Sequence, residues 1–319
     1  MIKERIFKCV RNAVPVALRT SCWFLKIMLP VTLFVTLLSY FGILPYLSSL
    51  TAPLFRFLGL PGDAALVFVT SIFTNIYTVI ALIVTLDFTV REGIILAVMC
   101  LISHGFIIET LVQKKTGSAA LRMVLLRLSG SLIAAVGLNW VLPQMPEVLS
   151  STMGTAVGFT ETMLTWLKGS LILCVKIFAI IISLMILQRL LEEFGILKVL
   201  SRLFAPLMYL FGLPASTSFL WIVGNTVGLA YGAAIMMDYG ASGYLNRREA
   251  DLLNHHLAVS HSELEDPLLF MVIGLPVFWL IIPRLILAIL AVWERRLELK
   301  LSEMGKLKNY RVSIRQDRM

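Results

Sequence analysis

The chain contains the same apolar segment twice, and this duplication constrains its fold more than any other feature of the sequence. Residues 41–61 read FGILPYLSSLTAPLFRFLGLP, and residues 194–214 read FGILKVLSRLFAPLMYLFGLP. Thirteen of these 21 positions are identical at a constant spacing of 153 residues. The similarity resumes at a spacing of 157 residues, in the pairs Arg91 and Arg248, Glu92 and Glu249, Ser103 and Ser260, His104 and His261, and Glu109 and Asp266. Duplicated halves in a membrane protein indicate a two-fold related architecture with a binding site between the repeats.

The composition is that of a membrane protein. Hydrophobic residues make up 58% of the chain, charged residues only 15%, and the mean hydropathy is +0.87. Two apolar stretches, 63–86 and 215–238, are interrupted by polar or glycine-rich sequence, which predicts broken helices or re-entrant hairpins. Uninterrupted stretches long enough to cross a bilayer lie at about 20–41, 94–112, 121–142, 169–190 and 268–293.

Basic residues flank these stretches. The formal net charge of +9 therefore indicates contact with lipid headgroups and not with nucleic acid. If the two halves are inverted relative to each other, most basic clusters and both termini fall on the cytoplasmic side. That arrangement requires a sixth crossing at about 249–266. We therefore predict a multi-pass protein of the bacterial inner membrane with cytoplasmic termini.

Together these patterns predict an all-α transmembrane bundle of two inverted repeats, with about six spans, two re-entrant or broken hairpins and amphipathic surface helices. The predicted organisation is a surface segment at 1–19, a first repeat at 20–142, a linker at 143–168, a second repeat at 169–296 and a polar basic cytoplasmic tail at 297–319. The expected partners are the lipid bilayer and a small polar solute or cation. The sequence does not decide whether the protein forms a homo-oligomer. No enzyme is expected, because the chain has no Walker A, GxSxG, HExxH or dinucleotide-binding pattern.

Polar side chains mark both interrupted stretches. Thr74 and Asn75 end the first break, and Asn225 and Thr226 lie in the second. An asparagine amide offers two donors and an acceptor to a polar solute. Asparagine also caps helix N-termini, and the two roles are compatible. We predict that these four residues bind the solute.

Residues 249–266, EADLLNHHLAVSHSELED, are too polar for a lipid-facing helix. On an uninterrupted helix, Asp251, Asn254, His261 and Glu265 would share one face, with His255 at its border. Such a face must meet a cavity, a solute or water. We therefore add Asn254 and His261 to the predicted solute-binding residues.

All four histidines lie in two matched segments of the repeats. Imidazole beside carboxylate suits proton coupling, hydrogen bonding to a solute, or ligation of a transition metal. For coupling or gating we predict His104, Glu109, Asp251 and Asp266. No cofactor is expected other than a bound cation or transition metal, for which the predicted ligands are His255, His261 and Glu265.

The pattern FGIL, APL and GLP, followed by a broken segment such as GNTVGLAYGAAIM at 224–236, resembles the Gate or nucleoside recognition domain. This domain occurs in small bacterial membrane proteins, in spore maturation proteins A and B, in concentrative nucleoside transporters and in the membrane part of ferrous iron transporter B. The resemblance covers nearly the whole chain as two Gate-like repeats. It implies a transport-type fold whose hairpins meet near the midplane. The cysteine of the iron transporters' gate motif is missing from 224–236.

We therefore expect a secondary transporter of a small polar solute, nucleoside-like and coupled to protons or another cation, with its site between the repeats. One alternative is a divalent transition-metal permease. Another is a non-transporting membrane scaffold or regulatory protein.

Overall fold

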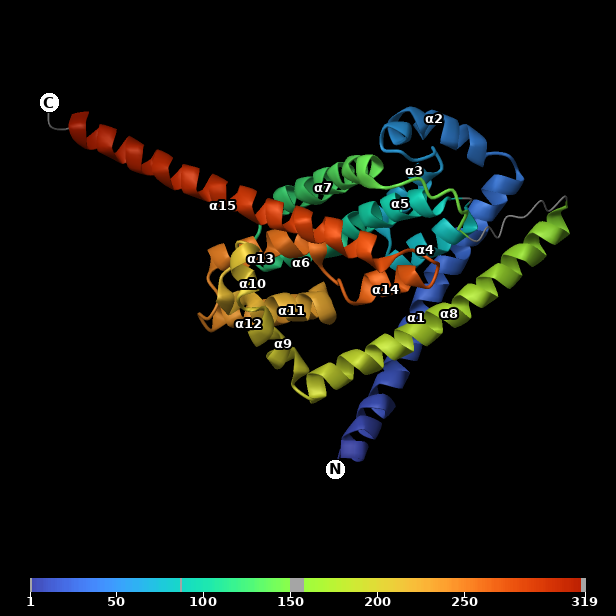
Figure 1. The fold of residues 1–319 in the computed structure, drawn as a ribbon, viewed down its shortest axis with the longest axis horizontal. Helices are drawn as coiled ribbons and strands as arrows, with labels where there is room; N and C mark the ends of the chain where they lie inside the picture. The colour runs from blue at the N-terminus through green and yellow to red at the C-terminus, as the bar shows by residue number, and fades with distance from the viewer. Residues whose placement is uncertain (1, 87, 150–157, 317–319) are drawn as a thin grey trace.

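The chain folds almost entirely into helices (Figure 1), as predicted from its sequence. The structure is a computed structural model and describes residues 2–86, 88–149 and 158–316. The first half consists of α1 (Ile2–Tyr40), α2 (Leu44–Phe57), α3 (Ala64–Phe73), α4 (Ile76–Thr85), α5 (Val90–Ser103), α6 (Phe106–Lys115) and α7 (Ala120–Val141). The second consists of α8 (Phe159–Glu193), α9 (Ile196–Phe204), α10 (Leu207–Leu210), the 3-10 helix η1 (Ala215–Thr217), α11 (Ser218–Thr226), α12 (Leu229–Ala241), α13 (Arg247–Ser260), α14 (Glu265–Met271) and α15 (Val277–Gln316).

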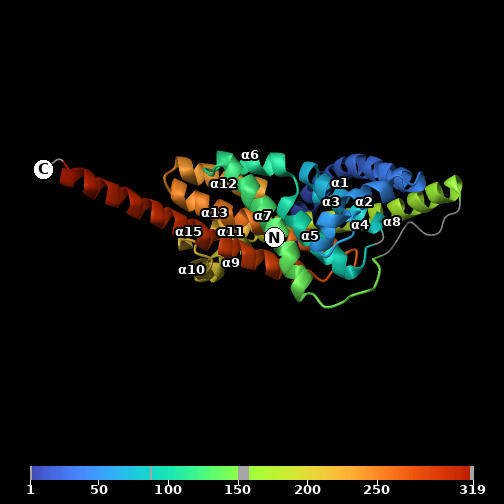
Figure 2. The same ribbon diagram turned by 90° about the horizontal axis from the view of Figure 1, so that it is seen from above.

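The two halves repeat the same series of elements. Helices α5 and α13 begin and end at positions 157 residues apart, and each starts with a capping box, Thr89 with Glu92 and Asn246 with Glu249. In a capping box the side chains satisfy backbone N–H groups that have no partner inside the helix. The long helices α1 and α8 begin the two halves and pack along each other (Figure 1). Helix α15 ends the second half and extends away from the bundle (Figure 2).

Four of the described helices are long and apolar enough to cross a membrane: Ile2–Tyr40, Ala120–Val141, Phe159–Glu193 and Val277–Met304. A fifth span results if α5 and α6, which are bent by 43° at their junction, are counted together. Both interrupted stretches are broken helices, as predicted, because α3 and α11 each end near the middle of the stretch. The expected single helix at 249–266 is wrong: α13 ends at Ser260, and α14 starts only at Glu265.

The predicted boundary at residue 19 does not coincide with a helix end, because α1 continues from Ile2 to Tyr40. Likewise, α15 continues as one helix through the start of the expected tail at 297. The roles of these terminal segments as a surface helix and a cytoplasmic tail stay predictions.

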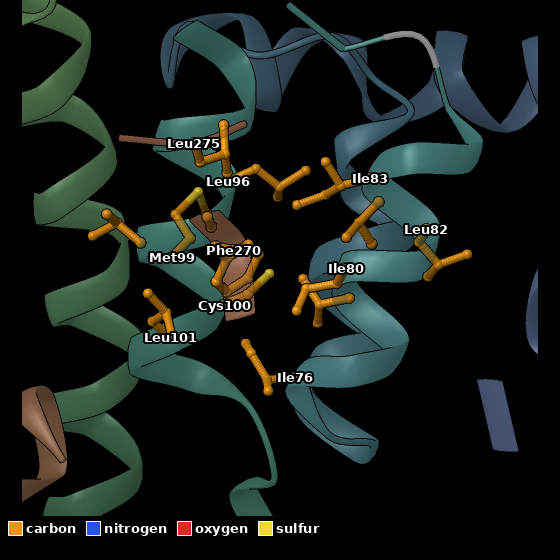
Figure 3. Packing of buried hydrophobic residues seen from close by; sticks show 14 of the residues in the cluster. Ile76, Ile80, Leu82, Ile83, Leu96, Met99, Cys100, Leu101, Phe270 and Leu275 are labelled. Carbon is orange, nitrogen blue, oxygen red and sulfur yellow. The ribbon is translucent and has the colours of Figure 1, made fainter. Parts of the chain in front are cut away.

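The apolar core is centred on α4 and α5 (Figure 3), where nearly every residue is buried. Ile80 of α4, Met99 of α5 and Phe270 of α14 are each at most 1% exposed. A helix that is apolar on all sides can be buried on all sides without leaving a polar side chain unpaired. Helix α13 is the equivalent of α5 and is also buried on all sides, although its sequence is polar. The polar groups of α13 must therefore find partners inside the protein.

Candidate functional site

The two matched histidines lie beside each other and are both buried. His104 follows the end of α5 and His261 follows the end of α13, and each backbone N–H still donates to its own helix. Each ring nitrogen Nδ1 lies against a carbonyl one turn earlier, at 3.1 Å from Cys100 O and 2.9 Å from Leu257 O. The other ring nitrogen, Nε2, of both histidines points toward the same carboxylate of the first half. The two ring centroids are 5.2 Å apart.

Glu109 joins the two imidazoles. Its Oε1 lies 3.1 Å from Nε2 of His104, and its Oε2 lies 3.3 Å from Nε2 of His261. Asp266, the equivalent of Glu109 in the second half, is also buried beside them. One oxygen of Asp266 and one ring nitrogen from each histidine lie within 4.8 Å of one another, a spacing that permits joint ligation of one cation. We call His104, Glu109, His261 and Asp266 the central cluster.

Several polar atoms of the central cluster have no hydrogen-bond partner among the described residues. They are Oε2 of Glu109, Nε2 of His261 and Oδ2 of Asp266. Buried polar atoms are normally satisfied, because leaving one unpaired costs about 1–3 kcal/mol. Oε2 of Glu109 and Nε2 of His261 nevertheless lie 3.3 Å apart, and Oε2 also lies 2.8 Å from Nη2 of Arg127. Among these three atoms, Oδ2 of Asp266 is thus the one with neither a hydrogen bond nor an ion pair to a described residue. Its position beside the two imidazoles indicates a site for a proton, a cation or a polar group of a solute.

Two buried arginines hold the backbone of this site in place. Nε of Arg127 donates to Ile102 O at 2.7 Å, and Nη2 donates to His104 O. Arg284 repeats the arrangement 157 residues later, with Nε donating to Val259 O at 3.0 Å and Nη2 to His261 O at 2.6 Å. Both guanidinium groups are fully buried. Arg127 of α7 therefore stabilises carbonyl groups where α5 ends, and Arg284 of α15 stabilises those where α13 ends.

The arginines were not predicted as site residues. Their only signal in the sequence is the spacing of 157 residues that they share with the matched histidines. Without that spacing, Arg127 and Arg284 look like the basic residues that commonly lie at the ends of membrane-spanning helices. Most hydrogen bonds of the two buried arginines go to backbone carbonyls, which leave no pattern in the sequence.

The two halves differ in the acid that each arginine meets. Nη2 of Arg127 lies 2.8 Å from Oε2 of Glu109 and its guanidinium stacks on the Phe106 ring at 4.7 Å. Nη1 of Arg284 lies 3.3 Å from Oε2 of Glu263, which occupies the position equivalent to Phe106. Among the described residues, Asp266, the equivalent of Glu109, therefore does not form the ion pair with arginine that Glu109 forms. The central cluster is asymmetric for this reason.

The predicted solute-binding residues at the helix breaks mostly bond to their own helices. Oδ1 of Asn75 accepts from Thr78 N at 3.2 Å and caps α4. The hydroxyls of Thr74 and Thr226 each donate to a carbonyl one turn earlier. The Nδ2 of Asn225 likewise donates to Trp221 O, whereas its Oδ1 is buried without a hydrogen-bond partner. Among these four, Asn225 is thus the one whose side chain has a buried polar atom without a hydrogen-bond partner in the part of the chain that the structure describes.

The backbone links each helix break to the central cluster. Gly105 N donates to Ser71 O at 3.0 Å, and at the equivalent place Ser262 N donates to Gly224 O at 3.1 Å. Both donors are in the left-handed region, with φ of 57° at Gly105 and 55° at Ser262. In each half, a residue of the helix before the break is thus hydrogen-bonded to the residue that follows the matched histidine.

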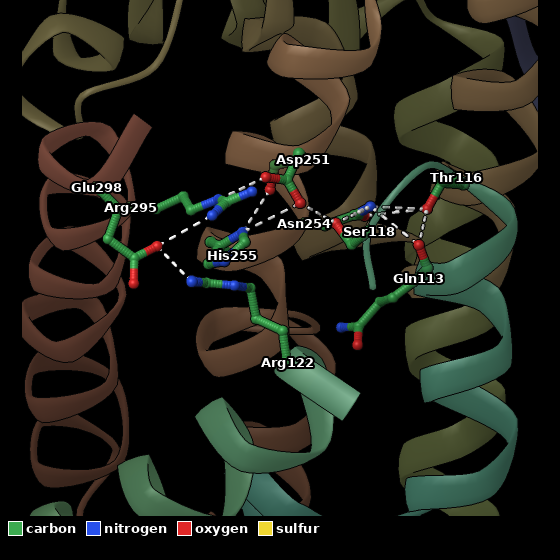
Figure 4. Close-up of polar contacts among 9 residues, drawn as sticks. All are labelled: Gln113, Thr116, Ser118, Arg122, Asp251, Asn254, His255, Arg295 and Glu298. Atoms are coloured by element: carbon green, nitrogen blue, oxygen red, sulfur yellow. Dashed lines mark hydrogen bonds and ion pairs between the residues drawn. The ribbon is translucent and has the colours of Figure 1, made fainter. Parts of the chain in front are cut away.

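The polar face predicted for 249–266 is divided between two places because α13 ends at Ser260. Asp251, Asn254 and His255 lie in a second cluster with residues of α6, α7 and α15 (Figure 4). Glu265 lies elsewhere, with its carboxylate oxygens 3.0 Å from the Tyr77 hydroxyl and 3.2 Å from Nε2 of Gln188. The predicted metal ligands His255, His261 and Glu265 are therefore not brought together. The three-residue group with metal-ligand spacing found among the described residues is His104, His261 and Asp266.

Specific hydrogen bonds hold Asp251 and Asn254 of the second cluster (Figure 4), whereas the side-chain amide of Gln113 and Nε2 of His255 are buried without a hydrogen-bond partner among the described residues. Asp251 accepts from Ser118 Oγ at 2.6 Å and from Arg295 Nε at 2.7 Å. Nδ2 of Asn254 donates to Gln113 O at 3.2 Å and to the Thr116 hydroxyl at 2.9 Å. These bonds connect α13 of the second half to the α6–α7 turn of the first. They favour a structural role for Asp251 and Asn254 at the interface between the halves.

The helical breaks, the duplicated halves and the buried polar centre define a polytopic membrane protein of the kind built from two gate-forming repeats. The chain belongs to the Gate family, whose description is "Nucleoside recognition", and the family model matches residues 22–119 and 174–291. The chain is also similar to the uncharacterized membrane protein YvoD of Bacillus subtilis (strain 168). The two are 33% identical over 273 residues, which cover 83% of this chain and 86% of YvoD. No solved structure matches the chain.

Proposed function

We propose that this protein is a secondary transporter of a small polar solute, coupled to a proton or another cation. The observation that carries this proposal is the convergence of His104 and His261, one from each repeat, on Glu109 beside Asp266. Such ionisable groups inside a membrane domain are costly and mark transport pathways or proton relays. The family description makes nucleosides the first solutes to test.

In this proposal the repeats are inverted in the membrane. Each crosses three times: α1, α5 with α6, and α7 in the first half, and α8, α13 with α14, and α15 in the second. Each hairpin, α3–α4 and α11–α12, enters and leaves the membrane on a single side, and the two hairpins open on opposite sides. Both termini lie in the cytoplasm. The central cluster would then lie near the midplane, where the four broken segments meet. Labelling of single cysteines in the α2–α3 and α10–α11 loops from either side of intact cells tests this topology, which requires opposite accessibility.

The transport test uses the full chain in liposomes. Uptake of a purine and a pyrimidine nucleoside is measured with and without an inward proton gradient. We expect gradient-driven uptake that is lost in Glu109→Gln and in His104→Gln. The matched control is His256→Gln, because His256 is a buried imidazole that bonds to Trp221 Nε1 at 3.2 Å and lies outside the central cluster. Equal uptake by all three variants would refute the role of the cluster.

A divalent-metal permease is the second candidate, favoured by the ligand spacing of His104, His261 and Asp266. Two imidazoles with carboxylates suit first-row transition metals. Protein purified without chelator would then retain Mn²⁺, Fe²⁺ or Zn²⁺, measured by elemental analysis, and His261→Ala would lose it. Wild-type protein free of transition metal that is nevertheless active in proton-driven nucleoside uptake favours the first proposal over this one.

A further inference from the structure

The duplication places a cavity behind the Gly-Leu-Pro corner of each half. The first has a volume of about 530 Å³ and the second about 640 Å³. They share four equivalent lining positions: Ala52 and Ala205, Arg56 and Tyr209, Pro61 and Pro214, and Gly62 and Ala215. The cavities are therefore products of one fold, and differences between them show what each half has specialised to hold.

In the first half, a basic side chain beside this corner has a neutral partner. Arg91 donates through Nη2 to the backbone oxygen of Asn139 at 2.7 Å and to its Oδ1 at 2.6 Å. The Asn139 side chain packs directly on Gly59 of the corner. Nη2 of Arg91 is thus paired within the protein, although its Nε is buried without a hydrogen-bond partner in the described part of the chain, and Arg91 does not line the first cavity.

In the second half the equivalent pair is Arg248 and Arg296, and both line the cavity. Two cations cannot pair, so each side chain takes another contact. Arg248 pairs with Glu303 at 2.8 Å, but both side chains are about half exposed, so the ion pair is weak. Arg296 donates through Nη1 to Gly212 O at 3.0 Å, and its guanidinium stacks on Trp293 at 5.1 Å.

The acid that lines the same cavity, Glu249, is already hydrogen-bonded within its own helix. Oε2 of Glu249 accepts from the backbone N–H of Asn246, as part of the capping box of α13. The second cavity therefore presents two guanidinium groups where the first half has an arginine paired with asparagine. Guanidinium groups bind phosphate oxygens through two parallel hydrogen bonds, and this makes arginine the preferred residue for such groups.

The position of the cavity indicates the source of the phosphate. Arg295 and Arg296 follow the apolar part of α15, at the place where the helix becomes polar. Tyr209, at 81% exposed, lines the cavity, and Trp293 stacks on Arg296 of its lining. Such aromatic residues concentrate at the level of lipid headgroups. We propose that Arg248 and Arg296 form a binding site for the phosphate group of an anionic phospholipid headgroup.

The test uses full-length protein in an uncharged detergent, titrated with phosphatidylglycerol or phosphatidylcholine and followed by native mass spectrometry. We expect one tight phosphatidylglycerol site, weakened roughly tenfold in Arg296→Asn, the substitution that restores the residue of the first half. Arg296→Lys keeps the charge without the planar fork and should give an intermediate loss. Thermal unfolding and gel filtration check that each variant is folded.

Two matched controls remove one positive charge elsewhere. Arg56→Gln does so in the first cavity, and Arg202→Gln does so on α9, outside the lining of the second. Both should leave the phosphatidylglycerol affinity unchanged. An equal loss in either control, or an unchanged affinity in folded Arg296→Asn, would overturn the proposal.

A second arm separates lipid from free phosphate. Thermal stability is compared in inorganic phosphate and in chloride at equal ionic strength. Stabilisation by inorganic phosphate that depends on Arg296, with no Arg296-dependent binding of phosphatidylglycerol, assigns the site to a soluble phosphate and overturns the lipid source. Dependence on Arg296 in the lipid arm supports the site as proposed.

Discussion

Replacement of Arg127 by methionine tests whether the buried arginines hold the candidate site together. Methionine keeps most of the aliphatic volume, so the cavity left behind is small. It removes the hydrogen bonds to Ile102 O and His104 O and leaves Glu109 without its buried guanidinium partner. Breaking a buried ion pair by removing one member costs about 3–5 kcal/mol, because the remaining charge is left uncompensated. We therefore expect the free energy of unfolding to fall by about 3–5 kcal/mol.

The matched control lies on the same helix. Arg122 of α7 pairs with Glu298, but their side chains are 29% and 37% exposed. An ion pair exposed to this extent contributes less than about 1 kcal/mol, so Arg122→Met should have a small effect. Unfolding is followed by tryptophan fluorescence during SDS titration in mixed micelles. If Arg127→Met loses no more stability than Arg122→Met, the reasoning about the buried arginine is wrong.

A double variant separates the charge from the hydrogen bonds. Adding Glu109→Gln to Arg127→Met removes the uncompensated carboxylate, so the loss should be about 1–2 kcal/mol smaller than the sum of the two single losses. The part that stays lost belongs to the two backbone carbonyls. Strictly additive losses would show that Glu109 and Arg127 are not energetically coupled.

Three further predictions follow from single contacts. Ser262→Gly should raise stability by about 1 kcal/mol and Gly105→Ala should lower it by a similar amount, because both positions have positive φ; thermal unfolding of the two variants must give opposite signs. Asn75→Ala should lower stability by about 1 kcal/mol through loss of the α4 cap, whereas Asn75→Ser should keep it; solute affinity lost in a fully stable Asn75→Ser protein would instead assign Asn75 to solute contact. Asn254→Ala should destabilise by about 1–2 kcal/mol because the Gln113 carbonyl and the Thr116 hydroxyl each lose one of their hydrogen bonds, and amide hydrogen exchange in the α6–α7 turn should then become faster.

Features that depend on local pattern could be predicted. The apolar stretches are long enough to fix the helices, and the Gly-Leu-Pro repeat marks the corners because glycine accepts the positive φ seen at Gly59 and Gly212. The breaks at 74–75 and 227–228 follow from polar and glycine residues inside apolar sequence. The matched histidines were identified because the spacing of 157 residues is visible without any knowledge of contacts.

The end of α13 was not predictable from composition. The polar face from Asp251 to Glu265 assumed that the helix continues through His261. Instead, Arg284 takes the carbonyls of Val259 and His261, and Ser262 N donates to Gly224 O of α11. These long-range bonds stabilise the break, and they redistribute the polar side chains between two clusters.

The sequence by itself determined that two related halves lie in a membrane and that each has a histidine and an acid at an equivalent position. This information is carried by hydrophobicity and by spacing, both of which are readable one residue at a time. Only the tertiary structure decided that Glu109 reaches across to His261, that Arg127 and Arg284 are buried against backbone carbonyls, and that Asp266 remains without an equivalent ion pair. The physical reason is that a buried charge takes whichever partner the packing of distant segments brings within reach, and that partner can be a carbonyl common to every residue.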